Sequence, residues 1–172
     1  MSAFEDQNDH IDMPISWEEM HRHTKTLARK LVDAGPWKGI IGVARGGLVP
    51  ACIIARELDV HLVETLCISS YDHKVQGSAK VLKIPADVGD GEGWLVIDDL
   101  VDTGNTFRLA REMMPKAFFA AVYAKPQGKP TVDNFTMEVS QDTWIHFPWD
   151  LEVRYSTPLA DAKKDLKTIS KT

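Results

Sequence analysis

Four short segments of almost continuous apolar residues constrain the fold of this chain more than any other feature. They span residues 39–43, 62–69, 94–97 and 117–124. A strand that is apolar on both sides must be covered on both faces of its sheet, which is the pattern of parallel sheets in α/β proteins. Helical patterns over residues 48–58 and 105–114 give the order strand, helix, strand, strand, helix, strand. We therefore predict an α/β fold with a mostly parallel central sheet flanked by helices.

A further helix is predicted ahead of the first strand. Ser16 is followed three residues later by Glu19, which is the capping-box pattern of a helix start. Gly35 and Pro36 then end the helical periodicity.

The chain divides by composition into three parts. Residues 1–15 are acidic and are predicted to form a loose arm, residues 16–158 form the folded domain, and residues 159–172 form a Lys-rich tail. Within the domain, residues 71–93 are rich in glycine and too long for an ordinary loop, so we expect a mobile lid there. The irregular sequence at about residues 126–158 predicts a small hood or flap rather than further regular sheet.

Length and charge exclude several classes of protein. A length of 172 residues fits one domain. The net charge of −5 argues against broad nucleic-acid binding, because nucleic-acid phosphates bind to basic surfaces. No apolar stretch approaches the ~20 residues that span a bilayer, and the acidic N-terminus lacks the positive charge of a signal peptide. Cys52 and Cys67 lie in apolar runs and are predicted to be buried, reduced thiols. These features predict a cytoplasmic protein.

The segment of residues 94–106 carries the strongest sign of a functional site. An apolar strand ends at Asp98 and Asp99, and a turn of small residues then opens a helix. Ligands of open α/β sheets bind at the carboxyl ends of strands, and the backbone N–H groups from Thr103 to Thr106 could hold one phosphate at the helix start. A sugar diol or a divalent cation is the natural partner of two adjacent carboxylates. The alternative, an acidic turn before an N-capped helix, does not explain all of these features together.

This segment resembles the phosphoribosyl diphosphate (PRPP) signature of the type I phosphoribosyltransferases. Further segments extend the resemblance in the same order along the chain: residues 43–50 resemble the diphosphate loop, residues 69–73 the start of the mobile lid, and residues 123–126, 141–145 and 148–150 the purine pocket. Within the family, the similarity is greatest to bacterial enzymes that act on xanthine and guanine. The resemblance implies the type I phosphoribosyltransferase fold, with a hood and a lid at the site.

The resemblance also implies which residues bind PRPP. The phosphate, diphosphate and ribose contacts fall on Arg45, Gly46, Asp98, Asp99, Asp102, Thr103, Gly104, Asn105 and Thr106. Asp99 would in addition hold Mg²⁺, the cofactor of the family. A cis peptide bond between Ala44 and Arg45 is a further implication.

For the purine base, the resemblance implies contacts from four side chains or main-chain segments. Lys125 would donate a hydrogen bond to the six-position oxygen, which favours oxopurines over adenine, whose amino group cannot accept. Trp144 would stack on the base, and the main chain of Trp144 and Ile145 would read the two-position substituent. Asp102 would be the catalytic residue, because it reaches the imidazole side of the purine, where a proton leaves as the glycosidic bond forms.

One lid position departs from the family pattern. Gly77 stands where the family carries an arginine that helps to hold diphosphate. The lid contacts that the resemblance implies therefore fall on Ser70, Tyr71 and Lys80, although a lysine is not a bidentate donor as an arginine is.

The implied reaction is a step of purine salvage, in which PRPP and guanine or xanthine, and also hypoxanthine, give GMP, XMP or IMP and diphosphate. Two alternatives are a hypoxanthine-preferring phosphoribosyltransferase and a non-catalytic PRPP-sensing regulator with the same fold. The regulator should have a basic face, whereas this chain is acidic and retains Asp102, Lys125 and Trp144.

The resemblance further implies a homotetramer and peripheral contact with the cytoplasmic side of the inner membrane. In the tail, an apolar stripe recurs at helical spacing and consists of Leu159, Ala162, Leu166 and Ile169. Such a segment could lie on an anionic membrane surface. The alternatives for it are a frayed terminus and docking on a neighbouring subunit.

Overall fold

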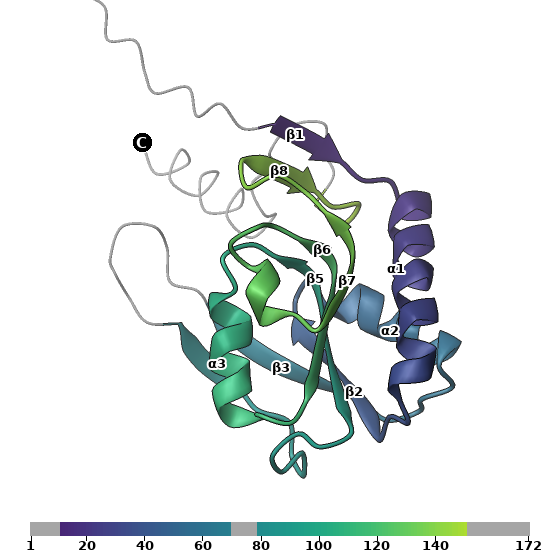
Figure 1. Ribbon diagram of the computed structural model, residues 1–172, viewed down its shortest axis with the longest axis vertical. Helices are drawn as coiled ribbons and strands as arrows, with labels where there is room; N and C mark the ends of the chain where they lie inside the picture. The colour runs from purple at the N-terminus through teal and green to yellow at the C-terminus, as the bar shows by residue number, and fades with distance from the viewer. Residues whose placement is uncertain (1–10, 70–78, 151–172) are drawn as a thin grey trace, which may run out of the picture.

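Residues 11–69 and 79–150 of the chain are described by the computed structural model (Figure 1). Their core is a six-stranded sheet with the strand order β4-β3-β2-β5-β6-β7. The strands are β2 (Gly39–Ala44), β3 (Val63–Ser69), β4 (Lys80–Lys83), β5 (Trp94–Val101), β6 (Phe118–Ala124) and β7 (Asn134–Glu138). All neighbouring strands are parallel except β4, which runs antiparallel to β3. The predicted α/β fold with a mostly parallel sheet is confirmed.

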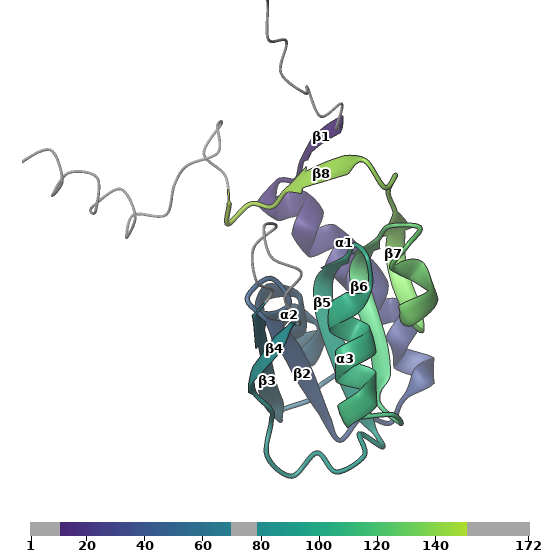
Figure 2. The same ribbon diagram turned by 90° about the vertical axis from the view of Figure 1, so that its left-hand side faces the viewer.

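Helices cover both faces of this sheet, as the apolar strands require. They are α1 (Trp17–Leu31), α2 (Leu48–Glu57) and α3 (Asn105–Met113). Successive strand residues point to opposite faces, so Ile40 joins the core cluster beneath α1 and α2, whereas Ile41 joins the cluster beneath α3. Figure 2 shows α3 on the near side of the sheet and α1 on the far side. All three predicted helices are therefore confirmed.

The first helix begins as the sequence predicts. The backbone N–H of Glu19 donates to the Ser16 hydroxyl at 3.2 Å, and Glu19 Oε2 accepts from the Ser16 backbone N–H at 2.9 Å. The short 3₁₀ helix η1 (Val32–Ala34) then leads to a cis peptide bond between Gly35 and Pro36.

Two further strands form a small separate sheet beyond one end of the central sheet (Figures 1 and 2). β1 (Ile11–Pro14) pairs in parallel with β8 (Thr143–His146), which comes from near the other end of the described chain. The predicted loose arm is therefore wrong for Ile11–Pro14. The four residues of β1 have too little apolar alternation to reveal a strand, and only the distant partner β8 makes them one.

The predicted hood and lid each contain a strand of the central sheet. β7, within the proposed hood, runs parallel to β6 and forms the sheet edge after the 3₁₀ helix η2 (Lys129–Thr131). This corrects the expectation that no regular sheet follows residue 126. β4, within the proposed lid, forms the opposite edge. Edge strands are only half covered, so the apolar runs of central strands do not occur in them. Residues 70–78 of the lid lie outside the described residues.

The prediction of two buried thiols is wrong for Cys52, which is exposed on α2, whereas Cys67 on β3 is half-buried. An apolar run that forms a helix still turns one side outward, which explains the position of Cys52. No helix in the ranges 11–69 and 79–150 is both long and apolar enough to cross a membrane.

Candidate active site

The adjacent carboxylates Asp98 and Asp99 lie near the carboxyl end of the central strand β5. Asp98 Oδ1 accepts from the Asp99 backbone N–H at 2.9 Å, and Asp99 Oδ1 accepts from the Leu100 backbone N–H at 2.7 Å. Burial raises the pKa of both carboxyl groups, and the neighbouring charge of Asp99 raises the pKa of Asp98 further. Among the described residues neither carboxylate forms an ion pair with a Lys, Arg or His. This pair is therefore suited to a cationic or hydroxyl-rich ligand.

The glycine-rich loop after β2 lies directly against this pair. A Cβ atom added to Gly46 would collide with the Asp99 carboxylate in its present orientation, so the Gly46 backbone approaches this carboxylate closely. The preceding Ala44–Arg45 peptide bond is cis, which confirms the implication of the resemblance. Arg45 is exposed. The loop thus brings the Gly46 backbone and the Arg45 side chain to the same end of the sheet as the two carboxylates.

The turn after β5 leads directly into α3. Gly104 has a φ of +84°, in the left-handed region that favours glycine, and it is the N-cap of α3. The side chains of Thr103 and Asn105 are exposed, and the Asn105 backbone N–H points to the Thr103 hydroxyl at 3.5 Å. Thr106 is half-buried in the first turn of α3. A helix start with free N–H groups and hydroxyls can bind a phosphate.

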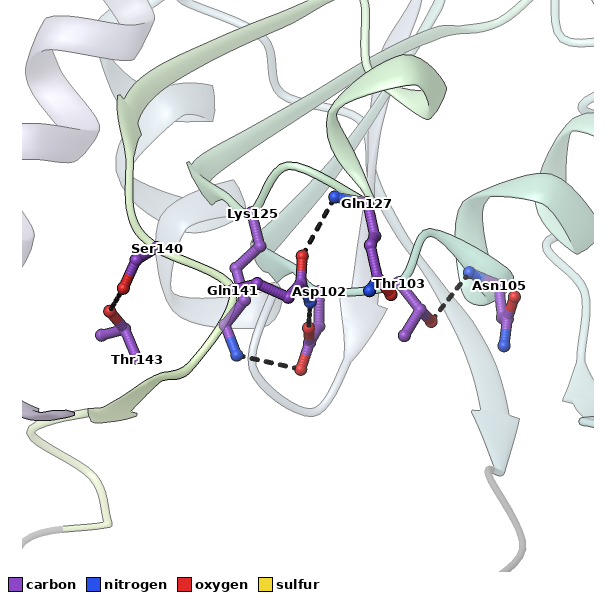
Figure 3. Close-up of polar contacts among 8 residues, drawn as sticks. All are labelled: Asp102, Thr103, Asn105, Lys125, Gln127, Ser140, Gln141 and Thr143. Atoms are coloured by element: carbon purple, nitrogen blue, oxygen red, sulfur yellow. Dashed lines mark hydrogen bonds and ion pairs between the residues drawn. The ribbon is translucent and has the colours of Figure 1, made fainter. Parts of the chain in front are cut away.

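Asp102 and Lys125 meet at the ends of the neighbouring strands β5 and β6. The Lys125 side chain is almost fully buried, yet its Nζ donates to Asp102 Oδ2 at 3.1 Å, where the carboxylate is half exposed (Figure 3). A buried ammonium group needs such a partner. The sequence-predicted proton acceptor and the predicted base donor are therefore brought together.

Gln141, in the loop between β7 and β8, is a third member of this cluster. Its Nε2 donates to Asp102 Oδ1 at 2.7 Å, as Figure 3 shows. Sequence reasoning placed Gln141 in a purine-pocket segment but gave it no role. Its position three residues before Trp144 was the only available signal, because the contact joins residues far apart in the chain.

The strand β8 presents the predicted base-reading residues on opposite sides. Trp144 has 55% of its surface exposed, whereas Ile145 is buried in the core beneath α1. This alternation leaves Trp144 on the more exposed side of β8. Its neighbour Gln141 contacts Asp102, so β8 begins close to the Asp102 cluster.

The lid residues are only partly described. Ser70 and Tyr71 lie outside the described residues. Lys80 is exposed on β4, which is separated from β5 by β3 and β2. The structure therefore does not bring Lys80 together with Asp98 and Asp99.

Comparisons with known proteins agree with this geometry. Residues 16–156 match the family described as the phosphoribosyl transferase domain. The chain is 64% identical over 149 residues to the xanthine-guanine phosphoribosyltransferase of Nitratidesulfovibrio vulgaris (strain DP4), which covers 86% of this chain and 90% of that protein. It is 60% identical over 147 residues to the enzyme of the same name from Desulfotalea psychrophila, which covers 85% and 91%. The crystal structure of a purine phosphoribosyltransferase from Pyrococcus horikoshii superposes with a TM-score of 0.73 at 26% identity, over 85% of this chain and 99% of that one.

Proposed function

This chain belongs to the phosphoribosyl transferase domain family, and from that premise we propose that it is a purine-salvage enzyme with PRPP as its phosphoribosyl donor. Guanine and xanthine are the proposed acceptors, with hypoxanthine as a third. The products are GMP, XMP or IMP and diphosphate. The observation that carries the proposal is the buried Lys125 beside the Asp102 carboxylate, next to a helix start that can bind phosphate.

Lys125 supports the choice of an oxopurine. Its ammonium group can only donate hydrogen bonds, so it matches the carbonyl oxygen at the six-position of guanine, xanthine or hypoxanthine. Adenine carries a donating amino group at that position and would meet a like donor. The exposed ring of Trp144 can stack on the purine, which contributes ~1–3 kcal/mol per base in comparable sites.

Asp102 is the proposed proton acceptor. As the purine nitrogen forms its bond to C1′ of the ribose, the bond from C1′ to the diphosphate oxygen breaks. The proton on the imidazole side of the base must then leave, and it passes to the Asp102 carboxylate. General base catalysis of this kind typically contributes 10²–10⁴-fold to the rate.

The donor substrate fits the remaining features of the site. The turn from Thr103 to Thr106 at the start of α3 is proposed to bind the 5-phosphate. Arg45 and the backbone of Gly46 are proposed to bind the diphosphate. The ribose hydroxyls can donate to the carboxylates Asp98 and Asp99.

Mg²⁺ is the proposed cofactor. Burial disfavours the ionised form of Asp98 and Asp99 and so raises their pKa, and a bound cation would offset that cost. Within the described residues no three His, Cys, Asp or Glu side chains gather to hold a metal ion. Two adjacent carboxylates nevertheless fit Mg²⁺, because this ion typically takes one or two carboxylates together with substrate oxygens. When bound at Asp99, Mg²⁺ would neutralise diphosphate charge in the leaving group.

The proposed function is tested with purified protein, Mg²⁺ and PRPP, and each of four bases in turn. We expect nucleotide product from guanine, xanthine and hypoxanthine, and none from adenine. Product formation should stop on addition of EDTA and return with excess Mg²⁺. A protein that uses only adenine, or none of the bases, would contradict the proposal, and PRPP binding without any turnover would favour the regulator.

We also propose, from the resemblance to the family, a homotetramer with a peripheral membrane contact. The tail, residues 159–172, lies outside the described residues and is the segment to be tested for that contact. Light scattering coupled to gel filtration should give four times the 19.2 kDa chain mass. Co-sedimentation with anionic vesicles should be salt-sensitive and should be lost in a chain that ends at Pro158. Equal sedimentation of both forms would exclude the tail from membrane contact.

A further inference from the structure

We propose that Gln141 is a positioning residue that holds one oxygen of the Asp102 carboxylate, so that the other oxygen alone exchanges partners during the reaction. The role in the reaction rests on the proposed function. The geometric role does not, because it follows from contacts within this chain. Gln141 lies in the loop between β7 and β8, where it is half-buried.

The orientation of the Gln141 amide is determined by its two partners. The Gln127 backbone N–H donates to Gln141 Oε1 at 3.0 Å. Because a backbone N–H can only donate, the amide oxygen must face Gln127, and the amide NH₂ group must face the other way. It then donates from Nε2 to Asp102 Oδ1 at 2.7 Å. The reverse orientation of the amide would place two donors together at Gln127 and two acceptors together at Asp102.

The backbone around Gln127 is itself firmly placed relative to Asp102. The Lys125 backbone N–H donates to the Val101 carbonyl at 2.9 Å, and the Gly128 backbone N–H donates to the Lys125 carbonyl at 3.0 Å. A Cβ atom added to Gly128 would lie 2.6 Å from the Val101 carbonyl oxygen and 2.7 Å from that of Asp102. The turn after β6 thus packs against the main chain of Asp102. Gln141, in the loop before β8, forms hydrogen bonds to Gln127 in this turn and to the Asp102 side chain.

The two carboxylate oxygens consequently have different partners. Oδ1 is held by Gln141 at 2.7 Å, whereas Oδ2 is held by Lys125 at 3.1 Å. When the base binds, the Lys125 ammonium is needed at the six-position oxygen, and Oδ2 becomes available to accept the purine proton. Oδ1 keeps its hydrogen bond from Gln141, because the base does not need this donor. Gln141 therefore keeps the carboxylate from turning at the moment when Lys125 leaves it.

Two variants of Gln141 separate these roles. Gln141→Leu removes both hydrogen bonds, and Gln141→Glu keeps the shape but replaces the donor with a carboxylate that repels Asp102. We expect kcat with guanine to fall about 10-fold in Gln141→Leu, as for the loss of one charge-assisted hydrogen bond, and further in Gln141→Glu. KM for PRPP should stay within about twofold, because Gln141 contacts only the proposed proton acceptor and the turn beside it.

Ser140→Ala is the matched control. Ser140 is the preceding residue, and its hydroxyl shares a hydrogen bond of 2.7 Å with the Thr143 hydroxyl rather than with Asp102 (Figure 3). We expect this variant to retain the wild-type kcat. An equal loss of kcat in Ser140→Ala and Gln141→Leu would show that the loop as a whole matters, and would overturn the specific role of Gln141.

Crystal structures of the wild type and of Gln141→Leu provide a readout that does not depend on activity. In the variant we expect the Asp102 carboxylate to turn away from its wild-type orientation or to adopt more than one. An unchanged Asp102 carboxylate in Gln141→Leu would overturn the inference, even if kcat fell. A wild type that makes no nucleotide would contradict the proposed function, and the comparison of the two crystal structures would still decide the positioning role. Should Gln141→Leu fail to fold, the same comparison is made with Gln141→Glu.

Discussion

Replacing Lys125 with methionine should weaken the use of every oxopurine by a similar factor. Methionine keeps an unbranched apolar side chain in the buried position, where Lys125 is only 5% exposed, and removes the charge. A hydrogen bond to a charged group contributes ~1.5–3 kcal/mol. Lys125 must give up its 3.1 Å contact with Asp102 to reach the base, which offsets part of this gain. We therefore expect a loss near the lower end, about 10-fold in kcat/KM, since ~1.4 kcal/mol corresponds to a factor of ten.

The assay compares kcat/KM for guanine, xanthine and hypoxanthine in Lys125→Met and in the wild type. Lys129→Met is the matched control, because Lys129 belongs to the same turn but pairs with Glu138 at 2.7 Å. It should retain wild-type kcat/KM for all three bases, and a thermal melt of each variant checks the fold. A loss confined to one base would refute the reasoning, because the six-position oxygen is common to all three.

Three further predictions concern other parts of the molecule. Asp102→Asn should lower kcat by at least ~10²-fold while KM for PRPP stays nearly unchanged, and a near wild-type kcat would remove Asp102 from proton transfer. Gly46→Ala should raise KM for PRPP more than KM for guanine, because the added methyl group collides with the Asp99 carboxylate; equal effects on both would count against a diphosphate role. Burial lowers the pKa of His23, which shares a 2.7 Å hydrogen bond with the Tyr123 hydroxyl, so the unfolded state binds a proton more readily and the free energy of unfolding should fall as pH drops below about 6.5. His23→Gln should lose part of this pH dependence in urea titrations, and an unchanged slope would contradict it.

The sequence predicts those parts of the fold that burial alone dictates. Of the four strands that the sequence predicts, β2, β5 and β6 are largely buried, whereas β3 is only partly buried, and the positions of all four are confirmed within a few residues. β1, β4 and β7 lie at edges or in the small second sheet, and their residues are partly exposed. A half-exposed strand of four or five residues has no distinctive pattern, and its existence depends on a partner elsewhere in the chain. Those three strands could therefore not be predicted.

The location of the candidate site could be predicted because its parts are neighbours in the sequence, but the hydrogen bonds within the site could not. The two carboxylates lie on β5 and the turn proposed to bind phosphate follows directly after this strand, so their order in the sequence is also their order in space. The cluster of Asp102, Lys125 and Gln141 instead joins the ends of three elements. The resemblance supplied roles for Asp102 and Lys125, whereas the hydrogen bond that gives Gln141 its role exists only in the folded chain.

The proposed PRPP contacts and the proposed base contact of Trp144 come from different sheets. The loops that carry the proposed PRPP contacts follow β2 and β5, and each of these two strands has a neighbouring strand on both sides. Trp144 lies on β8, whose only strand partner within the described residues is β1. A two-stranded sheet is marginally stable alone, so β8 depends on its anchors in the main core, where Ile15, Ile145 and Phe147 are buried. The proposed PRPP side of the site is therefore built on strands that are paired on both sides, whereas the proposed base side depends on a two-stranded sheet and on the Gln141 contact to Asp102.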